Sequence, residues 1–255
     1  MQNLNDLRLA VLIDADNIPY KKVKEMMEEV ALYGIPTFKR IYGDWTQPNL
    51  IGWKKVLLEN AITPIQQYSY TVGKNSSDSA LIIDAMDILY SGKVDGFCIV
   101  SSDSDFTRLA IRLREAGMKV IGIGEKKTPN PFIIACDKFI YLEVIQNQED
   151  PTEIEEKENN KVEPKQRRKN VKIRIPENII GSIKNTIDTV ADDDGWAFLG
   201  DVGNLILKKK PDFDPRNYGY QKLSTLIKSI KTISVDQRES GSKYVKHIFV
   251  KNIDK

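Results

Sequence analysis

Four aspartates follow two apolar segments of the chain with the same spacing. Asp14 and Asp16 end the run VLIDAD, and Asp103 and Asp105 follow the run CIVSS. If each run is a strand that leads into a helix, these side chains lie at the carboxyl edge of a parallel sheet, where open α/β folds hold their ligands. Carboxylate oxygens gathered at one place suit Mg²⁺ or Mn²⁺, and these ions serve the chemistry of phosphate esters. We therefore expect a divalent metal site at this edge.

A third segment, GKNSSDSALIIDAMD, adds two further acids. Asp78 falls in the first turn of a predicted helix, and Asp84 lies about 240° farther around it, so the two do not share a face. Carboxylates that converge raise one another's pKa unless a cation lies between them, which favours metal binding. Any one of these aspartates could be only a helix cap, but the set at one predicted edge favours a site.

The elements that must position these acids alternate between strand and helix over the first 145 residues. This alternation predicts an α/β fold, with a mostly parallel sheet and helices on both of its faces. We expect strands at 9–14, 36–43, 63–70, 96–102, 119–125 and 139–144, and helices across 23–30, 81–89 and 106–113 that each end near a glycine.

The remaining residues divide into a charged segment and a second small domain. Residues 146–172 are rich in charge and poor in apolar side chains, which predicts a flexible linker between a domain at 1–145 and another at 173–255. In the last domain, three helical patterns precede two strand patterns, the order of a winged-helix module. It contains 14 Lys and Arg against 11 Asp and Glu, so it is the better electrostatic match for a polyanion.

The composition narrows the possible chemistry. The 255 residues include two cysteines and one histidine, which disfavours zinc, disulfide and histidine-based catalysis. The chain shows neither an apolar run long enough to span a membrane nor the pattern of a secretion signal. We therefore expect a cytoplasmic protein without membrane partners, in which carboxylates carry any catalysis.

Together, the segments IDADN, GKNSSDSALIIDAMD, VSSDSDFTRLAIRLREAG and KVIGIG resemble the NYN family, a branch of the PIN-like ribonuclease superfamily, over about residues 8–145. The resemblance implies a PIN-like fold, a Mg²⁺ or Mn²⁺ cofactor, and hydrolysis that leaves a 5′-phosphate and a 3′-hydroxyl. It assigns the metal to Asp14, Asp78, Asp103 and Asp105, with Asp84 as a further metal position, and gives Asn17 the orientation of a metal-bound water or a phosphate. Lys74 is assigned to RNA phosphate.

The segment DDDGWAFLGDVGNLILKKKPDFDPRNYGYQKLSTLI resembles the LOTUS domain, also called OST-HTH, within about residues 175–250. The resemblance implies RNA binding and, for some members, a protein partner. Among this domain's side chains, cationic ones suit phosphates and a tyrosine suits base stacking. The candidate RNA contacts are Lys208, Lys209, Arg216, Tyr218 and Lys222.

The leading hypothesis is thus a metal-dependent ribonuclease whose winged-helix domain binds RNA. One alternative is an RNA-binding adaptor that keeps the acids without turnover, because a metal site does not guarantee a productive substrate pose. Another is a phosphatase with Asp14 as an aspartyl nucleophile, although Asn17-Ile18-Pro19 replaces the threonine that such enzymes carry after the first acids. The sequence leaves the RNA target, the number of metal ions and the oligomeric state open.

Overall fold

The computed structural model describes residues 7–68, 76–145, 175–239 and 246–254. The chain divides into two compact units, Met1–Glu153 and Ile154–Lys255, and each is considered by itself. The predicted linker, residues 146–172, lies outside the described residues, so the exact domain limits stay a prediction. Within the described ranges, none of the helices has the length and apolar composition needed to cross a bilayer.

The first unit is built on a six-stranded sheet in which every pair of neighbouring strands is parallel. The strand order is β3-β2-β1-β4-β5-β6. The strands are β1 (Arg8–Asp14), β2 (Ile35–Gly43), β3 (Thr63–Gln66), β4 (Gly96–Val100), β5 (Lys119–Gly124) and β6 (Lys138–Tyr141).

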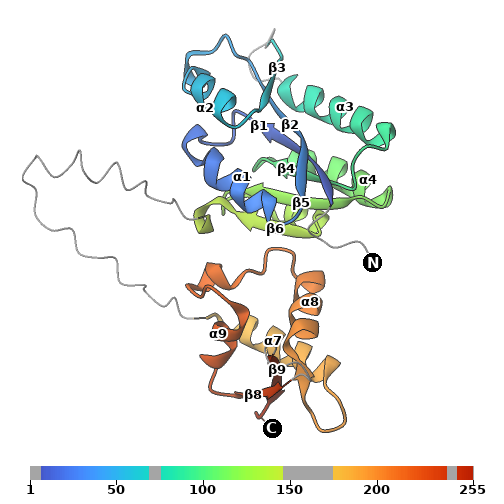
Figure 1. Ribbon diagram of the computed structural model, residues 1–255, viewed down its shortest axis with the longest axis vertical. Helices are drawn as coiled ribbons and strands as arrows, with labels where there is room; N and C mark the ends of the chain where they lie inside the picture. Colours follow the sequence, from blue (N-terminus) through green and yellow to red (C-terminus); the bar gives the residue numbers. More distant parts are fainter. Residues whose placement is uncertain (1–6, 69–75, 146–174, 240–245, 255) are drawn as a thin grey trace, which may run out of the picture. The chain divides into compact units, whose positions relative to one another are not determined.

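Helices cover both faces of this sheet, which confirms the predicted fold class (Figure 1). Strand β1 contributes to the core on both faces, because its successive side chains point to opposite sides of the sheet. Leu9, Val11 and Ile13 pack into the core on the side of α1 (Val23–Ala31) and α2 (Trp53–Glu59). Ala10 and Leu12 pack on the other side, against α3 (Ser76–Ser91), α4 (Thr107–Glu115) and α5 (Asn130–Ala135).

The chain order reverses between β1 and β4. From β1 the sheet extends one way through β2 and β3, and from β4 it extends the other way through β5 and β6. The carboxyl ends of β1 and β4 therefore lie at this reversal, which is the usual ligand position in such sheets. Both predicted pairs of aspartates follow these two strands.

The structure corrects several predicted elements. Helices α2 and α5 were not predicted, because each is short and its apolar residues show no sustained helical period. Strand β4 ends at Val100 instead of Ser102, and the hydroxyls of Ser101 and Ser102 accept hydrogen bonds from the backbone amides of Asp103 and Glu125. Strand β6 ends at Tyr141 and a short 3₁₀ turn, Leu142–Val144, replaces its predicted end.

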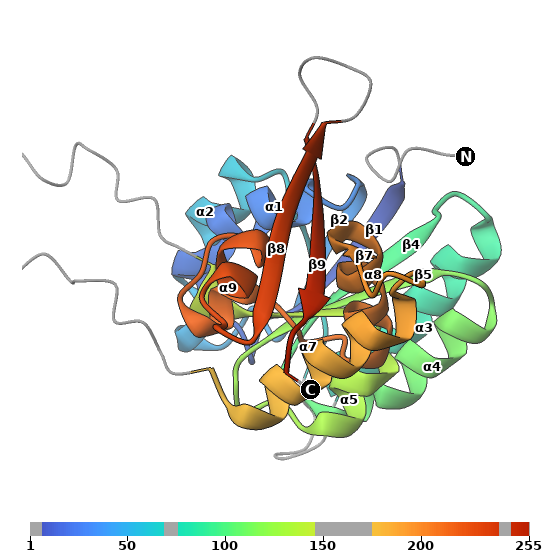
Figure 2. The same cartoon turned by 90° about the horizontal axis from the view of Figure 1, so that it is seen from below.

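The second unit is a small helical domain with an antiparallel sheet, as predicted. Helices α7 (Glu177–Val190), α8 (Leu199–Lys209) and α9 (Leu223–Lys228) enclose an apolar core with the sheet. Strands β8 (Ile233–Glu239) and β9 (Lys246–Asn252) lie side by side as the wing (Figure 2), and the turn that joins them is outside the described residues. An unpredicted two-residue strand, β7 (Ala197–Phe198), pairs with the other side of β9.

Candidate active site

Asp14 is the last residue of β1, and it is buried at the reversal of strand order. Its side chain is 1% exposed. One oxygen, Oδ2, accepts hydrogen bonds from Asn17 Nδ2 at 2.5 Å and from Ser101 Oγ at 2.9 Å, while Oδ1 accepts from the Asp16 amide at 3.2 Å. The predicted site residues Asp14 and Asn17 are therefore in direct contact, and Ser101 ties them to β4.

Ser101 also fixes the loop that carries the next two acids. Its hydroxyl oxygen accepts a hydrogen bond from the Asp103 amide at 3.1 Å. Asp103 in turn caps the 3₁₀ turn Ser104–Phe106, because its Oδ1 accepts from the Asp105 amide at 2.9 Å. Asp103 therefore serves as a cap and still has Oδ2, which is outside this hydrogen bond, for a ligand.

A close approach of two loops supports this arrangement. Ser102 Oγ accepts a hydrogen bond from the Glu125 amide at 2.9 Å, which joins the loops after β4 and β5. A Cβ on Gly124 would lie 2.6 Å from the Ser101 carbonyl oxygen. Only glycine lets β5 end this close to Ser101.

Asp78 comes from the first turn of α3 and meets the two acids of the β4 loop. One carboxylate oxygen each of Asp78, Asp103 and Asp105 lies within 4.8 Å of the others. Asp78 is 9% exposed, Asp103 is half-buried and Asp105 is exposed, so the group opens to solvent on one side. Three of the five acids predicted to hold metal thus converge, from chain segments more than twenty residues apart.

The electrostatics of this cluster reflect crowding of like charge. Burial, followed by the charges of Asp14, Asp103, Asp105 and Asp16, raises the pKa of Asp78 to about 6. The pKa of Asp14 is also raised, mainly by burial and further by Asp103, against the lowering effect of its hydrogen bonds. Burial and the charges of Asp14 and Asp44 raise the pKa of Asp16. Each of these shifts is what a bound cation would reverse.

The donor set fits the implied metal ion. All donors are carboxylate oxygens, which hard cations such as Mg²⁺ and Mn²⁺ prefer. Cys98 and Cys136 are buried within the core, where burial raises the pKa of both thiols, so they behave as apolar core residues. Asp78, Asp103 and Asp105 would hold the ion, whereas the buried Asp14, also predicted as a ligand, is not part of this group of three.

Asp84 has a different environment from the one expected of a metal ligand. Its Oδ1 accepts a hydrogen bond from the Arg40 guanidinium and its Oδ2 accepts one from the Tyr42 hydroxyl, both residues of β2. Burial and the hydrogen bond to Asp84 raise the pKa of Tyr42, so the phenol keeps its proton. The structure therefore favours a role in fastening α3 to the sheet over the predicted metal contact.

Two residues near the site were not predicted as functional. The hydroxyl of Ser101, which bridges Asp14 and the Asp103 amide, has no distinguishing signal in the sequence. Asp44 comes directly after β2, much as Asp14 ends β1, so the strand-then-aspartate pattern could have found Asp44. Its oxygens accept hydrogen bonds from Thr46, Gln47 and Gln66, which lower its pKa and make it an organiser of its own loop.

The predicted RNA contacts fall into three situations. Lys74 lies outside the described residues. Lys208 and Lys209 at the end of α8, and Lys222 before α9, are exposed and available to phosphates. Arg216 is instead engaged by Asp214, with Nη2 2.7 Å from Oδ2, which fixes its side chain within the domain.

Tyr218 is half-buried rather than presented as a free ring. Its ring centroid lies 6.2 Å from that of Phe213, and it packs against the apolar core of its unit. Burial, with a smaller contribution from Asp212, raises the pKa of its hydroxyl. Its predicted stacking on a base would therefore use the part of the ring that the core leaves open.

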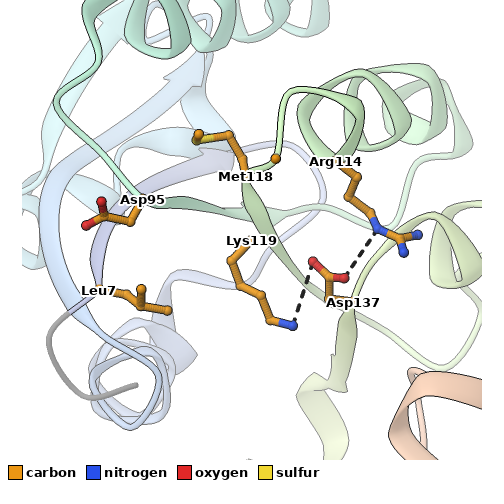
Figure 3. Close-up of a pocket in the computed structure, with 7 residues that line it drawn as sticks. Leu7, Asp95, Arg114, Met118, Lys119 and Asp137 are labelled. Atoms are coloured by element: carbon orange, nitrogen blue, oxygen red, sulfur yellow. Dashed lines mark ion pairs between the residues drawn. The ribbon is translucent and has the colours of Figure 1, made fainter. Parts of the chain in front are cut away.

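A cavity of about 600 Å³ lies at the opposite, amino edge of the sheet (Figure 3). Its polar lining consists of ion pairs, including Arg114 Nε with Asp137 Oδ1 at 3.3 Å and Lys119 Nζ with Asp137 Oδ2 at 3.8 Å. This cavity does not include the clustered acids. This cavity and the chemically distinctive cluster are thus at different edges of the sheet.

Comparisons with known proteins agree with both resemblances. The model of the NYN domain matches residues 8–143, and that of the OST-HTH/LOTUS domain matches residues 174–245. No curated protein matches the chain.

Solved structures similar to the chain include a protein of unknown function from Vibrio parahaemolyticus, 20% identical over 55% of this chain and 94% of that one, with a TM-score of 0.45. An uncharacterized protein from Nitrosomonas europaea is 28% identical over 42% and 90%, with a TM-score of 0.29. A protein from Chromobacterium violaceum is 30% identical over 33% and 90%, with a TM-score of 0.27. Since the NYN match extends over more than half of the sequence and includes every acid of the cluster, the chain belongs to the NYN domain family and carries an OST-HTH/LOTUS domain after it.

Proposed function

We propose that the NYN unit is a metal-dependent ribonuclease that hydrolyses phosphodiester bonds at the cluster of Asp78, Asp103 and Asp105. The observation that carries this proposal is the convergence of one oxygen from each acid within 4.8 Å, at the reversal of strand order. A bound Mg²⁺ or Mn²⁺ would supply nucleophile activation and neutralisation of phosphate charge. Membership of the NYN family supports the same reaction class.

The protein's own groups around the cluster have separable roles. Asp78, Asp103 and Asp105 attract the cation and so set its position. Asp14 adds a further negative charge, and Asn17 and Ser101 hold its carboxylate in one orientation through their hydrogen bonds. Asn17 would also orient a phosphate or a water with the remaining donor of its amide.

The burial of Asp14 disfavours the phosphatase alternative. A carboxylate that attacks phosphorus must reach it in line, but Asp14 is 1% exposed and its Oδ2 is engaged by two donors. The downstream OST-HTH/LOTUS domain also suits a polymeric substrate better than a small phosphate ester. We propose that this domain binds RNA through Lys208, Lys209 and Lys222, in the cytoplasm.

Manganese-dependent cleavage of labelled RNA tests the proposal directly. The full chain is incubated with single-stranded and structured RNA, and wild type is compared with Asp103→Asn. We expect cleavage by the wild type, loss of cleavage on chelation, and loss in the variant. Equal rates in the two proteins would reject the site.

Wild type and an Asp14→Asn variant together separate the enzyme from a non-catalytic adaptor. RNA binding is measured by fluorescence anisotropy in the presence of a chelator. An adaptor would bind RNA equally well with Asp14→Asn and would show no manganese-dependent cleavage in either form. Cleavage by the wild type alone would exclude it.

A further inference from the structure

One face of the sheet in the second unit carries aromatic rings and cations that the proposed RNA contacts do not include. Strand β9 alternates, so that Val250 is buried in the core while Phe249 and Lys251 point to the other side. Phe198 of β7 lies opposite Phe249 in the register. We call this surface the aromatic face; it consists of Trp196, Phe198, Arg238, His247, Phe249 and Lys251.

The rings of this face lie close enough to form a continuous platform. The centroid of the Phe198 ring is 5.4 Å from that of His247 and 5.9 Å from that of Phe249. Phe198 is 37% exposed, and His247 and Phe249 are half-buried. Three rings from two adjacent strands therefore line up at spacings typical of stacked or edge-to-face aromatic groups.

Two cations lie over the same rings. The Arg238 guanidinium carbon is 4.3 Å from the centroid of Phe249 and 5.4 Å from that of Trp196. Lys251 Nζ is 6.0 Å from the centroid of Trp196. Asp236 contacts Arg238 Nε at 3.0 Å, which holds the guanidinium on the sheet rather than away from it. Positive charge and aromatic rings thus lie together on this face.

The apolar core does not account for these rings. The core cluster of this unit, as described, is formed by other side chains, among them Ile183, Val202 and Val250. A Cβ on Gly200 would lie 2.6 Å from the Phe198 ring, so a glycine at this position leaves the ring the room it occupies. A large apolar side chain at the surface usually marks an interaction site when it belongs to a contiguous patch.

The chemistry of the aromatic face fits single-stranded nucleic acid. Bases stack on aromatic rings and on guanidinium planes, and phosphates bind the neighbouring cations. The excess of positive charge in residues 173–255, with 14 Lys and Arg against 11 Asp and Glu, complements a polyanion. We infer that the aromatic face binds single-stranded RNA, with a base on Phe198 and phosphates at Arg238 and Lys251. The inference rests on the proposed function, since it adds a second RNA surface to the lysines of α8 and α9.

Equilibrium binding of the full chain to a labelled oligouridine tests this inference. Anisotropy is measured with a chelator present, so that no cleavage occurs. Phe198→Leu keeps an apolar side chain but removes the ring, and we expect it to raise Kd about tenfold, the usual effect of losing one stacked base. Arg238→Ala is expected to raise Kd and to reduce the slope of log Kd against log salt by about one.

Matched controls come from the same strand and from the other unit. Gln237→Ala changes an exposed neighbour of Arg238 whose side chain points to the opposite side of β8. Tyr90→Ala removes an aromatic side chain that is 74% exposed on α3. Both should bind RNA like the wild type, and Phe198→Tyr, which keeps a ring, should restore binding to within about twofold.

The outcomes separate this inference from the proposed ribonuclease. Unchanged Kd in both Phe198→Leu and Arg238→Ala would overturn the aromatic face as an RNA site, whether or not the chain cleaves RNA, and would leave it to a protein partner. Absence of any RNA binding by the wild type would overturn it together with the RNA-binding part of the proposed function. Weaker binding in the variants without any cleavage by the wild type would support the aromatic face and reject the nuclease.

Discussion

The two edges of the parallel sheet both carry aspartates, but their surroundings differ. At the amino edge, Asp95 accepts hydrogen bonds from the Arg8 amide and guanidinium, and its pKa falls to about 2 mainly through those bonds. At the carboxyl edge, burial and four neighbouring aspartates raise the pKa of Asp78 to about 6. One edge neutralises its acids with basic side chains, and the other accumulates negative charge.

This difference teaches which feature indicates function. The amino edge holds the cavity of about 600 Å³ in Figure 3, and its acids Asp95 and Asp137 stabilise the fold through ion pairs. The carboxyl edge has the acids whose protonation is perturbed by one another. Stored electrostatic repulsion is a better sign of a cation site than the size of a hollow.

The largest expected effect is on activity, and it tests whether the carboxyl edge, and not the amino edge, holds the active site. Asp103→Asn removes a charge from the cluster, and we expect the manganese-dependent rate to fall on the order of a thousandfold, since the ion contributes several kcal/mol to the transition state. The matched change at the other edge, Asp95→Asn, should alter the rate less than twofold. Initial rates on one labelled RNA measure both. Similar losses in the two variants would contradict the assignment of the carboxyl edge.

A smaller effect is expected at Ser101, whose hydroxyl orients Asp14 and the Asp103 loop. Ser101→Ala should reduce the rate or the affinity for Mn²⁺ by about 10- to 100-fold, as is usual for residues that orient metal ligands. Titration of the Mn²⁺ signal by electron paramagnetic resonance measures the affinity. Ser102→Ala is the control, because that hydroxyl contacts the β5 loop instead of an acid. Equal effects of the two changes would contradict the proposal that Ser101 orients the acids of the site.

A third prediction compares Asp84 with Asp78 of the same helix, because Asp84 contacts Arg40 and Tyr42 and Asp78 belongs to the acidic cluster. Asp84→Asn weakens the contacts to Arg40 and Tyr42, so we expect unfolding to become easier by about 1–2 kcal/mol, with Mn²⁺ affinity nearly unchanged. Tyr42→Phe should show part of the same loss of stability. Chemical denaturation and Mn²⁺ titration of the same samples measure both quantities. A large loss of Mn²⁺ affinity in Asp84→Asn would restore it as a metal ligand.

The smallest effect is the pH dependence of stability without metal. Asp78 has a folded pKa of about 6, above its unfolded value of about 4, so the folded state holds more protons between these values and stability decreases as pH rises through this window. Asp78→Asn should therefore be more stable than wild type at pH 7 by about 1 kcal/mol, after allowance for screening by solvent.

Addition of Mn²⁺ should reverse this order at pH 7, because the ion binds and stabilises only the protein with the intact carboxylate. Melting temperatures at pH 4 and pH 7, with and without Mn²⁺, measure the effect. A wild type that is more stable than the variant at pH 7 in the absence of metal would contradict the electrostatic account of the cluster.

The sequence by itself determined the alternation of strands and helices, the winged-helix order of the second unit and the two families. It also placed Asp14, Asp78 and Asp103 at strand ends and a helix start. These features are local: apolar periodicity and the residues at strand ends follow from short stretches of chain. The short helices α2 and α5 were not predicted from the sequence, since one or two turns of helix leave too few periodic positions to recognise.

Only the tertiary structure decided which acids share a site. Asp78 and Asp84 lie on different faces of one helix, and the structure shows that Asp78 meets Asp103 whereas Asp84 meets Arg40 and Tyr42, because a side chain's partners depend on which neighbouring element its side of the helix contacts. The bridging hydroxyl of Ser101 is decided in the same way, by the pairing of β1 with β4. Distances between segments far apart in the chain arise from packing, and the spacing of residues along one segment does not determine how that segment packs against others.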